Sequence, residues 1–475
     1  MKYLACLVIL FSSYYASATH YRSADMSIRR VSANVLEATL TTYAKWSSPS
    51  NLADKDTVTI SWGDGSSSIA YRVNGPDVGF PGAPGPNGIP DGELLEGDFK
   101  KNVYIATHQY TSAMNGVYKI SFFDFNRMDG IANIQAGNSV NVPMYIEVSI
   151  DIDNMDATGS MATPVFTVPP IYFANLNDTL VFNPGAYDAD GDLMQFSLIT
   201  PLQADGQNVP SYRTLDVVCP DRAFDIDTDN GDITWITPCQ VGIYSLAIQI
   251  REYRNGLLLS TTMRDMQFIV LSDPYHPPVI NPVVDTILAP GDVLNYSFMA
   301  SVDDNDSVSL ELFPPQFLTA GNSPAIFTSQ DGSIATGNFT WAPNASWNNE
   351  YPYIFTVAAK RSYMVGPNAL LQSSFSTFRV WVADSNTVIA GIKPKQQEVG
   401  IRLYPNPAQR YLNIDADQRI DAVSIHSANG KVLFNSPMTN GGQKIDILGY
   451  AAGMYYVHVY IGGRAYTRKF VKYAD

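Results

Sequence analysis

Charged residues, histidine and cysteine are all scarce in this sequence. Asp, Glu, Lys and Arg together make up 16% of the 475 residues, and the chain has 5 His and 3 Cys. No histidine lies in an HExxH spacing, no CxxC pair is available for zinc or redox chemistry, and no GxSxG elbow or phosphate-binding loop occurs. We therefore predict no catalytic residues and expect that the protein is not an enzyme.

Basic residues are the scarcer of the two charged classes. The chain has 30 Lys and Arg against 45 Asp and Glu, which gives a formal net charge of -15. A chain of this charge repels phosphate backbones and anionic membrane surfaces. We therefore expect no nucleic-acid partner.

Aromatic and turn-forming residues are abundant. The sequence has 28 Tyr, 33 Gly and 30 Pro, and aromatic residues reach 12%. This composition favours β-strands joined by turns over exposed helices. At roughly 100 to 150 residues per domain, the chain should divide into about four domains.

The N-terminus carries the pattern of a secretion signal. Lys2 supplies a positive start, an apolar run follows over residues 4–11, and Ala16, Ser17 and Ala18 form a small-residue cleavage site. The alternative is a membrane anchor, but the run is far shorter than the ~20 residues that a spanning helix needs. We predict a signal peptide at residues 1–18 and hence an exported chain.

Two cysteines remain after the signal. Because exported proteins meet an oxidising environment, Cys219 and Cys239 are predicted to form a disulfide. A pair of unpaired thiols is the alternative.

Residues 19–155 carry the elements of a first module. A strand-like run at residues 57–61 leads into the turn Trp62-Gly63-Asp64-Gly65, and His108-Gln109-Tyr110 comes later, before Gly116-Val117-Tyr118. In this order the elements resemble a PKD domain, which implies an immunoglobulin-like β-sandwich with a structural role for His108. About 40 residues separate the two motifs, where the family has fewer. We expect this Pro/Gly-rich insertion to be an extended surface loop or, alternatively, a ligand-contacting loop.

Residues 164–272 and 276–384 look like repeats of each other. Each begins with an acidic turn, continues through a strand, an Asn/Asp-Gly turn and a Thr-Trp pair, and ends on a long strand. The tryptophans are Trp235 and Trp341. Both segments resemble the cadherin-like and immunoglobulin-like repeats of bacterial surface proteins, which implies two further β-sandwiches.

A polar linker at residues 385–400 precedes the last predicted domain, residues 401–475. Its elements are Tyr404-Pro405-Asn406-Pro407, a hairpin signal at Asn429-Gly430 and a strand from Gly453 to Val457. Together they resemble the type A C-terminal sorting domain of type IX secretion cargo. The resemblance implies that residues 401–475 bind the type IX machinery, guide the chain across the outer membrane and are then removed, often with attachment of the product to the cell surface.

The acidic turns of the two repeats are candidate metal sites. Carboxylates at alternate positions can converge on calcium, which takes six to eight oxygen ligands. The candidate ligands are Asp188, Asp190, Asp192, Asp303, Asp304 and Asp306. An EF-hand is excluded because Ile199 stands at the twelfth position, where a bidentate Glu is needed. The alternative is that Asp and Gly simply form tight turns.

The sequence thus predicts an all-β protein of tandem immunoglobulin-like β-sandwiches with a C-terminal β-sandwich sorting domain. We expect a secreted or cell-surface binding or adhesion protein with an unknown extracellular glycan or protein ligand, and with no cofactor other than calcium. Two alternatives stay open. One is a secreted, glycan-active hydrolase with its site in the first module, and the other is a structural or gliding-associated surface component.

Overall fold

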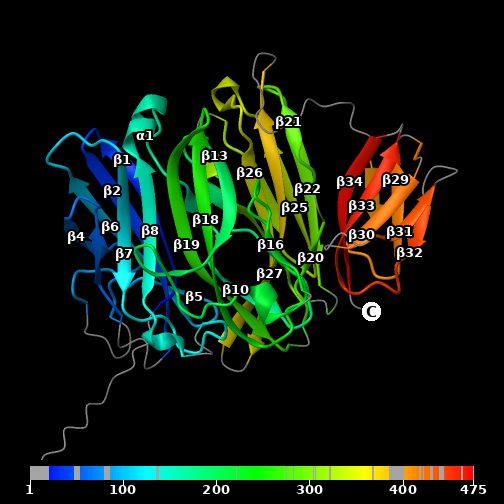
Figure 1. Cartoon of the computed structure of the whole chain (residues 1–475), viewed down its shortest axis with the longest axis horizontal. Coiled ribbons are helices and arrows are strands. Elements are labelled where there is room, and N and C mark those ends of the chain that lie inside the picture. Colours follow the sequence, from blue (N-terminus) through cyan, green and yellow to red (C-terminus); the bar gives the residue numbers. More distant parts are fainter. Residues whose placement is uncertain are drawn as a thin grey trace, which may run out of the picture.

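Strands dominate the computed structural model of this chain (Figure 1). It describes residues 21–47, 54–79, 86–134, 138–220, 222–273, 275–281, 283–302, 304, 306–319, 323–365, 368–384, 401–416, 419–420, 422–427, 432–437, 443–461 and 464–473. The predicted signal peptide and the 385–400 linker lie outside these ranges. In the part described, no helix is both long and apolar enough to cross a membrane.

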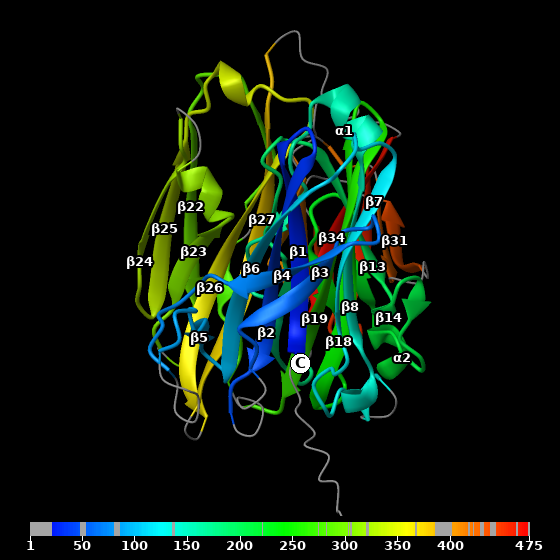
Figure 2. The ribbon, with the colours of Figure 1, turned by 90° about the vertical axis from the view of Figure 1, so that its left-hand side faces the viewer.

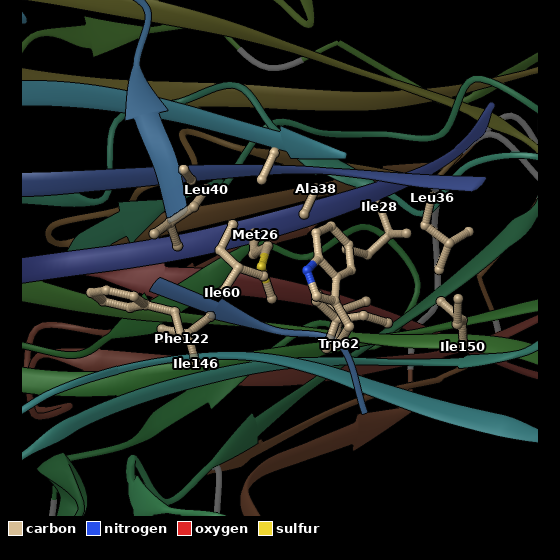
Figure 3. Packing of buried hydrophobic residues seen from close by; sticks show 14 of the residues in the cluster. Met26, Ile28, Leu36, Ala38, Leu40, Ile60, Trp62, Phe122, Ile146 and Ile150 are labelled. Carbon is tan, nitrogen blue, oxygen red and sulfur yellow. The ribbon is translucent and has the colours of Figure 1, made fainter. Parts of the chain in front are cut away.

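The first module is a curved sheet around one apolar core. Its strands are β1 (Tyr21–Ser32), β2 (Val35–Lys45), β3 (Thr57–Ser61), β4 (Ser67–Arg72), β5 (Glu93–Leu95), β6 (Phe99–Gln109), β7 (Val117–Asp124) and β8 (Met144–Asp151). Along β2, buried residues alternate with more exposed ones, as expected for a strand with one face on the core. Figure 3 shows the Trp62 indole at the centre of this core, between side chains of β1, β2 and β8.

The second and third modules share one strand order. In the second, β10 (Ile171–Asn175), β19 (Leu257–Leu271), β18 (Gly242–Arg254) and β13 (Leu193–Ile199) form one sheet, and β11 (Leu180–Phe182), β17 (Ile233–Trp235) and β16 (Phe224–Ile226) form the other. In the third, the same places are taken by β21 (Thr286–Leu288), β27 (Asn368–Val382), β26 (Tyr353–Val365) and β23 (Ser309–Phe313), and by β22 (Leu294–Ser301), β25 (Ile334–Trp341) and β24 (Ile326–Gln330). In both, the first strand pairs in parallel with the last.

Short elements complete these modules. They are α1 (Ile152–Thr158), β9 (Val165–Phe166), β12 (Ala186–Tyr187), β14 (Leu202–Ala204), β15 (Gln207–Asn208), α2 (Leu215–Val218) and β20 (Val279–Ile280), with single 3-10 turns at Ser139–Asn141, Pro315–Leu318 and Ala345–Trp347. Helix α1 bridges the first two modules. The Asp151 side chain caps it by accepting a hydrogen bond from the Asn154 N–H, and Gly159 ends it with a φ of 74°.

The first two modules are continuous with each other. Strand β19 pairs with β1 and with β8, so a strand of the second module lies beside both edges of the first (Figure 2). Two buried ion pairs cross this junction, Arg264 with Asp25 and Arg127 with Asp265. The junction is therefore held by hydrogen-bonded strand pairing and by buried ion pairs, and not by a flexible linker alone.

The third module packs against the second through apolar side chains. Phe313, Ile354 and Ala358 of the third module belong to the same buried cluster as the core of the second. The Tyr172 hydroxyl donates to the Ser373 carbonyl, and the Asn349 amide donates to the Gly191 carbonyl at 2.6 Å. Three modules thus meet along one side-by-side array (Figure 1).

The C-terminal domain is a separate β-sandwich. One sheet contains β28 (Ile401–Tyr404), β29 (Tyr411–Ala416) and β32 (Gln443–Asp446), and the other contains β31 (Val432–Pro437), β30 (Ala422–Ser427), β33 (Gly453–Ile461) and β34 (Arg464–Lys472). Leu412, Ile414, Val423 and Val457 fill its core. The hairpin turn expected at residues 429–430 lies outside the described residues. The predicted fold class, tandem β-sandwiches followed by a C-terminal β-sandwich, is confirmed.

Candidate functional site

The two cysteines of the second module are joined. Cys219 and Cys239 form a disulfide with their Cα atoms 5.7 Å apart. Cys219 is fully buried at the end of α2, whereas Cys239 lies on the surface before β18. The bond therefore ties the loop that carries α2 to the base of a central strand.

The motif residues of the first module form a structural cluster. The rings of Trp62 and His108 stack with centroids 5.1 Å apart, and His108 Nε2 lies 2.9 Å from an Asp64 carboxylate oxygen. The Tyr110 hydroxyl donates to the Trp62 carbonyl at 2.8 Å. These contacts fasten the turn after β3 to the end of β6, and they give His108 a packing and hydrogen-bonding role.

The acidic turn of the second module contributes two carboxylates to a buried cluster. Oxygens of Asp188, Asp192 and Glu252 all lie within 4.8 Å of one another. Glu252 comes from β18, where it pairs across the sheet with Met194 of β13. We call these three residues the carboxylate triad.

Asp190, the third candidate ligand of this turn, points elsewhere. One of its carboxylate oxygens accepts hydrogen bonds from the backbone N–H groups of Met161 and Ala162 at 2.7 and 2.9 Å. Asp190 therefore anchors the segment between the first and second modules. The sequence prediction missed Glu252 because only strand pairing brings it to the turn.

The triad is held by few hydrogen bonds. Arg254 forms an ion pair with Asp192, Asp188 Oδ2 accepts from the Asp192 N–H at 2.6 Å, and Glu252 Oε2 accepts from the Ser260 hydroxyl at 2.5 Å. Burial raises the pKa of Asp188 to about 7 and raises the pKa of Glu252 well above its usual range. Asp188 is 6% exposed and Glu252 is 0% exposed.

The corresponding turn of the third module is arranged differently. Asp304 and Asp306 both form ion pairs with Arg361, and Asp303 lies outside the described residues. The carboxylates are 34% and 49% exposed, whereas the guanidinium is fully buried and stacks 4.5 Å from the Tyr275 ring. Here a side-chain cation already occupies the space between the carboxylates.

A cavity of about 610 Å³ opens where the three modules meet, which we call the junction cavity. Its walls are aromatic, contributed by Tyr43, Phe99, Tyr172, Phe173, Phe182 and Phe375. Binding pockets for small ligands usually enclose roughly 300 to 1,000 Å³ and combine apolar walls with a few polar groups. The junction cavity fits that description.

Polar groups surround the mouth of the junction cavity. The Ser362 hydroxyl donates to the Glu96 carboxylate at 3.1 Å, and Lys360 forms an ion pair with Glu311. Glu96 follows β5 at the end of the long insertion of the first module, which therefore reaches the third module. The sequence prediction missed this site because its walls come from three modules that are distant in the sequence.

Further hydrogen bonds hold the long insertion. The Asp91 carboxylate accepts from the N–H groups of Val78 and Gly79, both at 2.8 Å, and Arg72 donates to the Pro90 carbonyl at 2.5 Å. Arg72 is fully buried and also forms ion pairs with Asp54 and Asp56. The insertion is thus fastened at its base, with residues 80–85 outside the described ranges.

Comparison with known proteins identifies the last domain. Residues 402–473 match the secretion system C-terminal sorting domain family. No curated protein matches the chain.

Several solved structures cover much of the chain at low similarity. Titin domains A168–A170 are 10% identical with a TM-score of 0.16, covering 65% of this chain and 99% of that one. The four N-terminal immunoglobulin domains of Dscam1 are 10% identical with a TM-score of 0.18, covering 95% and 99%. The protein SGBP-B of Bacteroides ovatus, solved with a mixed-linkage heptasaccharide, is 10% identical with a TM-score of 0.14, covering 66% and 70%.

At these TM-scores the matches add nothing to the assignment of the fold, which rests on the strand pairing described above. The family match is specific to one domain and agrees with the sequence prediction for that domain. It indicates that this chain is a type IX secreted protein, exported from the cell by means of its C-terminal sorting domain.

Proposed function

We propose that the exported chain is a binding protein that holds its ligand in the junction cavity. The observation that carries this proposal is the convergence of three modules on one aromatic-walled space of about 610 Å³. A chain of simple spacer modules has no need for such a space, because each sandwich closes its own core. The continuous sheet across the first junction keeps the walls contributed by the first and second modules in fixed positions.

A small glycan is the ligand that best suits this lining. Sugar rings stack on aromatic faces through their C–H groups, and their hydroxyls bond to serine and carboxylate groups. The cavity offers both kinds of surface, with aromatic walls and a mouth that includes Ser309, Ser362 and Glu96. A glycan also needs no opposite charge on the protein, which suits a chain with a net charge of -15.

Binding is favoured over hydrolysis by the exposure of the acidic groups. A glycosidase needs one carboxylic acid that stays protonated near neutral pH, which usually requires burial. The carboxylates that line the cavity, Glu96, Glu311 and Asp331, are all on the exposed surface. We therefore propose that the protein binds its ligand without cleaving it.

The remaining features fit display outside the cell. Removal of the sorting domain after export would leave the three-module array, residues 19 to about 390, at the cell surface or in the medium. The PKD-like motif of the first module and the cadherin-like acidic turns of the other two are in keeping with an adhesive surface protein. The contacts of His108 with Trp62 and Asp64 support a structural role for the first of these motifs.

The test is a glycan array probed with the labelled full-length protein and with two tryptophan variants. Ser309→Trp fills the junction cavity, whereas Ser329→Trp places the same ring on the exposed strand β24 of the same module. We expect the wild type and Ser329→Trp to bind a common set of glycans, and Ser309→Trp to bind them at least ~10-fold more weakly. Equal binding by Ser309→Trp, or no glycan bound by the wild type, would contradict the proposal.

A further inference from the structure

We infer that the carboxylate triad of the second module is a binding site for one divalent cation, with calcium as the expected ion. Asp188 and Asp192 come from the turn before β13, and Glu252 comes from β18. The site is distinct from the junction cavity, and its existence does not depend on the proposed glycan function.

The geometry of the triad matches a shared ion. Three oxygens bound to one calcium at 2.3 to 2.6 Å each must lie within roughly 4.6 to 5.2 Å of one another. The nearest oxygens of Asp188, Asp192 and Glu252 all lie within 4.8 Å. Carboxylates that merely form a tight turn have no reason to converge with a residue of a neighbouring strand.

Two buried oxygens in the triad have no donor. Among the described residues, no hydrogen-bond partner reaches Asp188 Oδ1 or Glu252 Oε1. Both oxygens face other carboxylates, and two carboxylates bond to each other only if one of them is protonated. A buried acceptor without a donor is costly, so these atoms need a cation or a proton.

The charges of the site give the same answer. When all three carboxylates are ionised they bring three negative charges, and Arg254 pairs with one of them, Asp192. One divalent ion would bring the remaining two negative charges to zero. A space of about 10 Å³ lies beside the turn, and its lining includes Asp188 and Asp192 together with the apolar side chains of Met194, Phe317 and Ile354.

An ion at this place would hold two modules together. The turn between Asp188 and Asp192 contacts the third module through the hydrogen bond from Asn349 to the Gly191 carbonyl. Arg254 also donates to the carbonyls of Asp190 and Thr158, at 2.9 and 3.1 Å, and so links the same turn to α1. Cation binding would therefore stiffen the junction of the second and third modules as well as the turn itself.

The experiment is a calcium titration of the chelator-treated full-length protein by calorimetry, with thermal unfolding measured in parallel. We expect one site per chain and a rise in the unfolding midpoint of at least ~2 °C at saturating calcium. Glu252→Gln keeps the shape of the side chain and removes its charge, so it should weaken calcium binding at least ~10-fold. The matched control is Asp304→Asn in the third module, which should bind calcium as the wild type does.

The cation-free proteins separate loss of a ligand from loss of the fold. Without calcium, Glu252→Gln should melt at the same temperature as the wild type or higher, because an amide needs neither a cation nor a proton to be neutral in this buried place. If Glu252→Gln does not fold, Asp188→Asn provides the same test from the other side of the site. Absence of calcium heat and of any midpoint shift in the folded wild type would overturn the inference and leave shared protons as the source of neutrality. Unchanged calcium binding in both variants would overturn it as well.

Discussion

The second and third modules have the same strand order, yet their acidic turns end in opposite arrangements. Met194 comes two residues after the last aspartate of the turn in the second module, and it pairs with Glu252. Val308 comes two residues after the last aspartate of the turn in the third module, and the register that joins Ser309 to Lys360 sets it opposite Arg361. The modules therefore differ at the residue opposite this position, which is an acid in one and an arginine in the other.

This single difference decides where the charges lie. In the second module the carboxylates are buried and outnumber the guanidinium, whereas in the third the guanidinium is buried and the carboxylates face solvent. The acidic turn alone does not determine whether a metal site forms. The residue that the neighbouring strand places beneath the turn determines it.

The largest expected effect follows from removing Arg254. Arg254→Ala leaves Asp192, whose side chain is 0% exposed, without its cation beside two other carboxylates. Breaking a buried pair in this way costs about 3–5 kcal/mol, so amides of β13 and β18 should exchange hydrogen much faster in a cation-free buffer.

The matched variant is Arg361→Ala. Its carboxylate partners are already solvated, so the loss should be smaller, at about 1–2 kcal/mol, and should come from the packing of the guanidinium on Tyr275. If Arg254→Ala and Arg361→Ala cost the same stability, the two acidic turns do not differ in the way described.

The next effect comes from placing an acid in the third module. Ala359 is fully buried opposite Leu310, so Ala359→Glu adds both volume and a carboxylate to a filled core. Overpacking and the burial of an unpaired polar group together should cost about 4 kcal/mol, seen as faster hydrogen exchange in β23 and β26. Ala359→Gln is the control for volume, since it carries no charge. A stable Ala359→Glu protein that binds a second calcium would show that an acid on this strand creates a metal site even while Arg361 holds the turn.

The disulfide is a further feature that the third module lacks. All three cysteines of the chain lie before residue 240, and the pair Cys219 and Cys239 closes a loop with a sequence separation of 20. Replacing both by serine should destabilise the second module by about 3 kcal/mol. The thermal unfolding midpoint of the wild type should drop under reducing conditions, and that of the double-serine variant should not. This result would identify the disulfide as the cause. If hydrogen exchange becomes faster in the third module to the same extent as in the second, the effect of the disulfide is not local to the second module.

Short motifs predicted the fold well because turns and strands depend mainly on residues that are close together in the sequence. The pairs ending in Trp235 and Trp341 mark the same strand in both repeats, and both rings are buried. The sites were harder to predict because they depend on strand pairing. Glu252 shows no signal in the sequence, and Asp190 looks like a ligand although it binds backbone N–H groups near residue 161. The junction cavity likewise depends on how three modules dock, which periodicity does not reveal.

The smallest expected effect is the pH response of the third-module turn. Desolvation alone would raise the pKa of Asp304, but hydrogen bonds from the Asp306 N–H and the Arg361 guanidinium lower it. A carboxyl group whose pKa is lower in the folded state stabilises the fold above its unfolded pKa of about 3.9, and that contribution is lost as the pH falls through the lower folded value.

The midpoint of the wild type should therefore exceed that of Asp304→Asn at pH 7, and the gap should close as the pH falls below about 4. Both proteins share every other titrating group, so the difference between their thermal midpoints isolates this one. The effect should be small because the carboxylate is partly solvated and screened by salt. A gap that stays constant from pH 7 to about 3 would mean that Asp304 titrates alike in the folded and unfolded chains. In that case Arg361 would hold the turn by packing alone, and the contrast with the charge-dependent second module would be stronger.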